Sequence, residues 1–109
     1  MRNRVLSMIG IAAKAGSVVS GEFSTEKAVK TGKAYLVIVS EEASANTCRM
    51  FSNMTDYYEV PMYLFGSKDE LGHCIGKEFR ASLAIVDERL AKAVESKLIA
   101  CNAKSMKTE

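Results

Sequence analysis

Leu36-Val37-Ile38-Val39 is the stretch that decides the fold. It lies within the strongest strand pattern of the chain, Ala34 to Ser40, and it is apolar throughout. A continuous apolar run of this kind predicts a strand that is buried on both faces, as in sheets that helices cover on both sides. We therefore expect an α/β domain built around this strand.

The residues before this strand predict two helices separated by a short extended piece. Gly16 suits the C-terminal cap of the first helix, residues 17–20 form the extended piece, and Gly21 opens a second helix that runs to about Lys30. The first helix is indicated by apolar residues at the spacing of one helix face, namely Val5, Met8, Ile9, Ala12 and Ala13.

The residues after the strand predict three more helices and two more strands. Ser44 is a suitable N-cap, Pro61 prevents continuation of that helix, and Ser67 caps a shorter one. The apolar stripe of the helix after Ser44 comprises Thr47, Met50, Phe51, Met54, Tyr57 and Tyr58. The other expected elements are a strand over 62–65, a helix over 68–75, a strand over 83–86 and a helix over 88–100.

Alternating helices and strands predict a three-layer α-β-α sandwich with a central mixed sheet of about four strands. The length of 109 residues, 48% of them hydrophobic and 26% charged, fits a single domain with one core. We assign residues 1–100 to this domain. The tail, residues 101–109, is expected to fray because it has little apolar content.

Cysteine usage and hydropathy indicate a cytoplasmic protein with no membrane partner. The three cysteines are an odd number without a close pair, which is typical of reduced thiols. No apolar run approaches the roughly 20 residues of a membrane-spanning helix. The basic start, residues 1–4, precedes an apolar stretch that Ser7 and Gly10 interrupt, so we interpret this segment as an ordinary helix and not as a signal peptide.

Basic residues are concentrated at the start of the chain, although the net charge is only +2. Residues 1–33 carry six basic and two acidic groups (+4), residues 34–75 carry two and six (−4), and residues 76–109 carry seven and five (+2). A local surplus of cations attracts a polyanion, since phosphate contacts depend on nearby Lys and Arg side chains.

The second helix places an aromatic residue among cations. At 100° per residue, Phe23 and Lys30 lie on the same arc as Lys27. If the opposite arc faces the sheet, these side chains and the backbone N–H groups of Gly21 and Glu22 form a nucleic-acid surface. In the alternative, Phe23 folds back as an N-terminal staple. The opposite arc holds small residues, namely Thr25, Ala28, Val29 and Gly32.

The sequence contains no motif for catalysis or metal binding. His73 is the only histidine, so no histidine cluster can bind a metal, and the side chain of its neighbour Cys74 diverges from it by about 100° on a helix. Residues 17–21 lack the glycine pattern of a nucleotide-phosphate loop. We therefore expect no enzyme activity, no cofactor, no metal and no small-molecule substrate.

A series of short motifs, taken in order, matches a known family over about residues 3 to 97. The motifs are Ile9 to Gly16, Ser20-Gly21-Glu22 with Lys27-Ala28, Gly32-Lys33-Ala34, Leu36 to Ser44, Val60-Pro61, Gly66-Ser67-Lys68 with Leu71-Gly72, Ile75-Gly76 and Leu83-Ala84-Ile85. They resemble the kink-turn RNA-binding ribosomal-protein family of archaeal L-seven-Ae and eukaryotic L-thirty type, and within it the bacterial YlxQ-type branch.

This resemblance implies a non-enzymatic protein that binds a sharply bent structured RNA, either ribosomal RNA or a messenger RNA kink-turn, and that associates with the ribosome. It implies that the start of the second helix meets sheared G·A pairs and that the loop before the last strand covers a flipped-out nucleotide. It also implies contacts from Glu42 and Lys68. The complete set of expected RNA-binding residues is Gly21, Glu22, Phe23, Ser24, Lys27, Lys30, Glu42, Lys68, Arg80, Ala81 and Ser82.

The chain departs from the family pattern just before Lys27. Archaeal and eukaryotic members carry an Asn-Glu pair at the positions that Phe23 and Ser24 occupy here. A phenylalanine side chain cannot accept a hydrogen bond from a guanine N–H, so base-edge readout differs at this point. The alternative function is therefore a protein-interaction module that keeps the fold without specific kink-turn recognition.

Overall fold

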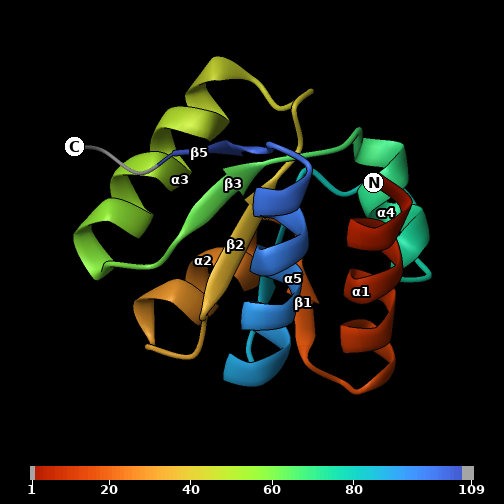
Figure 1. Cartoon of the computed structure of the whole chain (residues 1–109). Coiled ribbons are helices and arrows are strands. Elements are labelled where there is room, and N and C mark those ends of the chain that lie inside the picture. Colours follow the sequence, from red (N-terminus) through yellow and green to blue (C-terminus); the bar gives the residue numbers. More distant parts are fainter. Residues whose placement is uncertain (1, 107–109) are drawn as a thin grey trace.

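The computed structural model describes residues 2–106 and shows helices on both faces of a five-stranded sheet (Figure 1). Among the described helices, none has the length and apolar character needed to cross a membrane. The elements in chain order are α1 (Arg2–Lys14), β1 (Val18–Ser20), α2 (Glu22–Lys30), β2 (Leu36–Val39), α3 (Ala45–Tyr58), β3 (Met62–Leu64), α4 (Lys68–Cys74), β4 (Ser82–Ile85), α5 (Glu88–Ala100) and β5 (Lys104–Ser105).

The strand predicted from the apolar run lies at the centre of the sheet. The strand order is β1-β4-β2-β3-β5, and all four residues of β2 are buried. β2 pairs in parallel with β3 and antiparallel with β4, which places Ile38 opposite both Tyr63 and Leu83. The sheet is therefore mixed, as expected.

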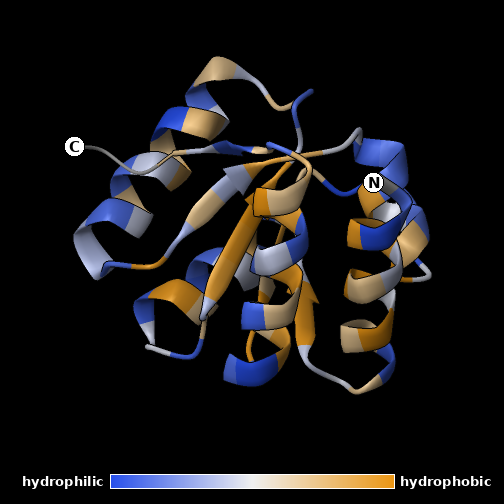
Figure 2. Cartoon of the chain, viewed as in Figure 1, coloured by the Kyte–Doolittle hydropathy of each residue, from blue (hydrophilic) through white to orange (hydrophobic). Residues whose placement is uncertain are grey.

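Alternate residues of β2 face two separate apolar clusters. Leu36 and Ile38 pack with residues of α1, α4 and α5, whereas Val37 and Val39 pack with residues of α2 and α3. In Figure 2 the hydrophobic residues are concentrated on the strands and on the helix sides next to them. Helices thus cover both faces of the sheet, in the three-layer arrangement that the buried strand predicts.

The sheet has five strands, not about four. β5 pairs antiparallel with β3, with Ser105 opposite Tyr63, and the N–H of Met106 donates to the carbonyl of Met62 at 2.9 Å. The expectation that the tail from residue 101 frays is therefore wrong for residues 104–106, and residues 107–109 lie outside the described part. Backbone hydrogen bonds to the open edge of β3 hold this two-residue polar strand in place. Because it has no apolar side-chain pattern, the sequence did not predict it.

The stripe predicted for α3 is correct in its middle and wrong at its end. Phe51 is fully buried and Thr55 is 3% exposed, whereas Tyr57 is 79% exposed. α3 ends at Tyr58, and Glu59 takes a left-handed conformation with φ of 59°. Thr55, which the predicted stripe did not include, is the last buried residue of the helix. The tyrosines of the last turn face solvent. Ser44 caps α3 by accepting from the Thr47 N–H at 3.1 Å, as predicted.

Candidate nucleic-acid interface

Three chain segments meet at the end of the sheet where β1 and β2 finish and β4 begins. The N–H of Gly21, at the start of α2, donates to the carbonyl of Ser82 at 2.9 Å. Beside it, the N–H of Ser40 donates to the carbonyl of Ala81 at 2.8 Å. Both bonds continue the antiparallel pairing of β4 with β1 and β2. They join the start of α2, the end of β2 and the loop before β4.

Side chains extend these contacts to the start of α4. The hydroxyl of Ser40 accepts from the Glu42 N–H at 3.0 Å, and a carboxylate oxygen of Glu42 accepts from the Lys68 N–H at 3.0 Å. The N–H of Arg80 donates to the Lys68 carbonyl at 3.0 Å, and its Nε donates to the Ser20 hydroxyl at 3.0 Å. Together with the two backbone bonds above, these contacts form a continuous hydrogen-bond network, which we call the sheet-end network. Its members are Ser20, Gly21, Ser40, Glu42, Lys68, Arg80, Ala81 and Ser82.

The start of α2 is exposed and has no side-chain cap. Gly21 is the N-cap residue, and its φ of 91° lies in the region that favours glycine. The first helical bond runs from the Thr25 N–H to the Gly21 carbonyl at 3.0 Å, so the N–H groups of Glu22, Phe23 and Ser24 precede the helical ladder. The sequence predicted that the N–H of Gly21 would be available to nucleic acid. It is instead bonded to the Ser82 carbonyl within the sheet-end network.

Phe23 projects into solvent from the first turn of α2. Its exposed fraction is 77%, while Thr25, Ala28 and Val29 on the opposite arc are buried. The helix therefore lies on the sheet through its small residues, as its spacing predicts. The staple alternative for Phe23 is wrong, because its ring faces away from the core.

The two lysines of α2 share the exposed face but differ in their surroundings. Lys30 Nζ lies 2.7 Å from a carboxylate oxygen of Glu26, and this hydrogen bond and charge raise the pKa of Lys30 above its ordinary value. Within the described residues Lys27 takes part in no ion pair. A nine-residue helix is about 13 Å long. Lys30 thus lies a helix length away from the sheet-end network.

Two of the expected RNA-binding residues have internal roles. The carboxylate of Glu42 binds the first N–H of α4, and Ser82 is 1% exposed with its carbonyl bonded to Gly21. Arg80 is half-buried, and its Nη1 also donates to the Phe79 carbonyl at 2.8 Å. Lys68 and Ala81, which also belong to the sheet-end network, are partly exposed. Ser82 is therefore buried beneath the surface, whereas Glu42 is exposed and also holds the start of α4 in place.

A second exposed aromatic residue, Phe79, was not predicted from the sequence. It is 66% exposed and directly precedes Arg80 in the loop between α4 and β4. This loop packs closely over α4, because a Cβ at Gly72 would lie 1.2 Å from the carbonyl oxygen of Glu78. The available signal was a phenylalanine between charged residues, in Lys77-Glu78-Phe79-Arg80, just before a strand.

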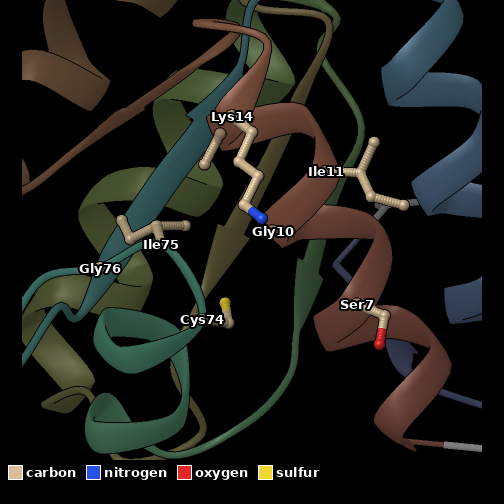
Figure 3. A pocket seen from close by; sticks show the side chains of 8 residues that line it. Ser7, Gly10, Ile11, Lys14, Cys74, Ile75 and Gly76 are labelled. Atoms are coloured by element: carbon tan, nitrogen blue, oxygen red, sulfur yellow. The ribbon is translucent and has the colours of Figure 1, made fainter.

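The candidate interface is an open surface, and a separate hollow lies between α1 and α4. Figure 3 shows Lys14, Cys74 and Ile75 lining this space, whose volume is about 430 Å³. Burial raises the pKa of the Cys74 thiol to about 11, so the thiol stays protonated at neutral pH. The lining residues include none of the expected RNA-binding residues. This hollow is therefore distinct from the candidate interface at the sheet end.

The fold and the sheet end define a class of small α/β domain. This chain presents a helix start, cations and exposed aromatic rings near the sheet end, a combination typical of nucleic-acid-binding proteins. Residues 3–96 match the model of the ribosomal protein L7Ae/L30e/S12e/Gadd45 family. The chain belongs to this family.

Named relatives and solved structures agree with this assignment. The chain is 37% identical over 91 residues to the RNA-binding protein YlxQ of Bacillus subtilis, covering 84% of this chain and 91% of that protein. It is 36% identical over 84 residues to the large ribosomal subunit protein eL30 of Sulfolobus acidocaldarius, covering 75% and 81%. A Bacillus halodurans protein of unknown function matches with a TM-score of 0.83 and 30% identity, covering 85% and 94%. The Giardia lamblia 15.5kD RNA binding protein shares the fold, with a TM-score of 0.77, 21% identity, and 89% and 86% coverage.

Proposed function

We propose that this protein binds a sharply bent structured RNA of the kink-turn type through the surface around the sheet-end network. The observation that supports this proposal most directly is the uncapped start of α2, which carries the exposed Phe23 in its first turn and adjoins the loop of the exposed Phe79 through the Arg80–Ser20 hydrogen bond. Backbone N–H groups at a helix start attract phosphate oxygens, and aromatic rings stack on unpaired bases. Membership of a ribosomal-protein family supports the same partner class.

Each group at the sheet end has a defined part in this proposal. Gly21 has no side chain, and a Cβ there would meet nothing within 4 Å, so an RNA backbone can approach the start of α2 closely. Lys27 and Lys68 neutralise phosphates, while Phe23 and Phe79 contact bases. Arg80 and Ala81 face the extruded nucleotide, and the sheet-end network holds them in place before RNA arrives.

The proposed role is non-enzymatic and lies beside the ribosome in the cytoplasm. The relative from Sulfolobus acidocaldarius is named as a large ribosomal subunit protein, and the relative from Bacillus subtilis is named as an RNA-binding protein. We extend both descriptions to this chain, with ribosomal RNA or a messenger RNA kink-turn as the target.

The test is binding of the purified protein to a kink-turn RNA, with the same RNA carrying Watson–Crick pairs in place of its sheared G·A pairs as the control. We expect tight binding to the first RNA and a large loss of affinity for the second across a salt series. Equal, weak and strongly salt-dependent binding to both RNAs would contradict kink-turn recognition. That result would favour the alternative function, a protein-interaction module. The observation behind this alternative is that Phe23 and Ser24 occupy the positions of the family's Asn-Glu pair.

A further inference from the structure

A second pair of exposed aromatic residues lies at the C-terminal end of α3, away from the sheet-end network. Tyr57 is 79% exposed and Tyr58 is 41% exposed. Their rings meet edge to face, with centroids 4.9 Å apart and planes inclined by 78°. Tyr58 therefore supports the ring of Tyr57, whose outer face is open to solvent. Such a rigid, half-supported ring is suited to stacking on a planar group.

This tyrosine pair is next to the cations of α2. The two helices cover the same face of the sheet and contact each other (Figure 1). The pKa of Lys30 is raised mainly by Glu26, with the smallest contribution from Tyr58. Lys33, just after α2, is also exposed. An exposed strip thus runs along α2 from Phe23 at the sheet end to the tyrosine pair.

The acidic residues near the tyrosine pair leave this strip basic. Glu26 binds Lys30 and holds its amino group in place at 2.7 Å. Asp56 and Glu59 line a hollow together with residues of β3 and β5, and no residue of α2 lines it. Among the described residues, Lys27 and Lys33 take part in no ion pair and are available to a polyanion that passes over α2, whereas Lys30 shares its charge with Glu26.

We propose that a single-stranded RNA segment flanking the kinked element runs along α2 and stacks a base on Tyr57, with Lys27, Lys30 and Lys33 contacting its phosphates. This inference rests on the proposed function, because the sheet end fixes where the RNA enters the strip. The occupant is single-stranded, since a ring can stack only on an unpaired base, and the strip adjoins the surface assigned to RNA. A helix length of about 13 Å corresponds to two or three nucleotides of extended backbone.

The experiment compares three kink-turn RNAs: one is blunt, and each of the other two carries about six unpaired nucleotides at a different end. For the wild-type protein we expect one of the two extensions to raise affinity. Tyr57→Ala is expected to remove this gain, a loss of roughly five- to 100-fold, while affinity for the blunt RNA stays unchanged. Ile99→Ala, a truncation of a residue that is 59% exposed on α5 across the sheet, is the matched control and is expected to keep the gain.

The outcomes separate this inference from the proposed function. If the wild-type protein binds the blunt RNA and neither extension adds affinity, the strip is not an RNA surface and the proposed function stands. A gain that survives Tyr57→Ala also overturns the inference. Failure of the wild-type protein to bind the blunt RNA would overturn the proposed function. If the protein then bound only the extended RNA, and Tyr57→Ala abolished that binding, the strip would still be an RNA-binding surface. Thermal unfolding of each variant verifies that the fold is intact.

Discussion

Gly72 and Glu78 are in backbone contact, so that a Cβ on Gly72 would lie 1.2 Å from the Glu78 carbonyl oxygen. Gly72 is buried in α4, and Glu78 belongs to the loop that presents Phe79 and Arg80 at the candidate interface. The absence of one side chain thus sets the position of that loop. Its effect should be visible both in stability and in RNA binding.

Gly72→Ala is expected to destabilise the protein by about 3 kcal/mol or more, because backbone and not a flexible side chain must move to admit the new methyl group. It should also weaken RNA binding, since Phe79 and Arg80 move with the loop. Gly76→Ala is the matched control in the same loop. Its Cβ would meet nothing within 4 Å, and only its φ of +76° carries a cost, of about 1–2 kcal/mol. Urea unfolding that shows equal stability for the two variants would contradict this account.

Phe23→Ala and Phe79→Ala are each expected to weaken binding to a kink-turn RNA by about 1–3 kcal/mol, the usual value of a base–aromatic stack. Their rings are 77% and 66% exposed, so the free energy of unfolding should change by no more than about 0.5 kcal/mol. Titration of labelled RNA and chemical unfolding measure the two quantities. A large loss of stability would show instead that these rings support the fold.

For a kink-turn RNA that carries the single-stranded extension, replacing Lys27 and Lys30 together by alanine is expected to reduce the magnitude of the slope of log affinity against log salt by about 2, one unit for each phosphate contact, because both lysines lie on the strip along α2. Lys92→Ala is a suitable control, because Lys92 pairs with Glu88 four residues earlier on α5 as Lys30 pairs with Glu26 on α2. The control should leave the slope unchanged. An unchanged slope in the double variant would exclude this face of α2 from the interface.

Tyr63 should make the protein less stable at high pH. Burial raises its pKa to about 12, and the hydrogen bond to Glu95 and the charge of that residue act in the same direction. The folded state holds the phenolic proton where the unfolded chain has begun to release it, at about pH 10. This contribution to stability is therefore complete below about pH 10 and is lost as the pH rises toward 12. When the free energy of unfolding is measured against pH, it should fall less steeply above about pH 10 for Tyr63→Phe than for the wild type. Tyr57→Phe is the control and should follow the wild type.

The sequence predicted the elements that depend on local apolar spacing. β2 was found from an unbroken apolar run, and α2 was oriented correctly because Ala28 and Val29 share one arc that is opposite Lys27. β5 was missed because Lys104–Ser105 is held by backbone bonds to β3 and not by side chains. Such pairing depends on which strand edge is open, and this property exists only in the assembled sheet.

The sequence named Glu42 and Ser82 as candidate residues without indicating their hydrogen bonds. Both lie at the sheet end, where Ser82 is buried with its carbonyl bonded to Gly21, and Glu42 is exposed with its carboxylate bonded to the Lys68 N–H. Phe79 was missed because its exposure depends on how the loop packs over Gly72. These properties arise from contacts across long sequence separations, which no local pattern records.

The sheet-end network has a consequence for synthesis of the protein. Gly21 and Ser40 donate to Ser82 and Ala81, so their partners are made some 40 to 60 residues later in the chain. A nascent chain that has not yet reached Ser82 lacks the acceptors that fix the start of α2 and the end of β2. The surface becomes complete only after β4 has emerged and inserted between β1 and β2. Unfinished chains therefore lack the assembled surface through which we propose that the protein contacts RNA.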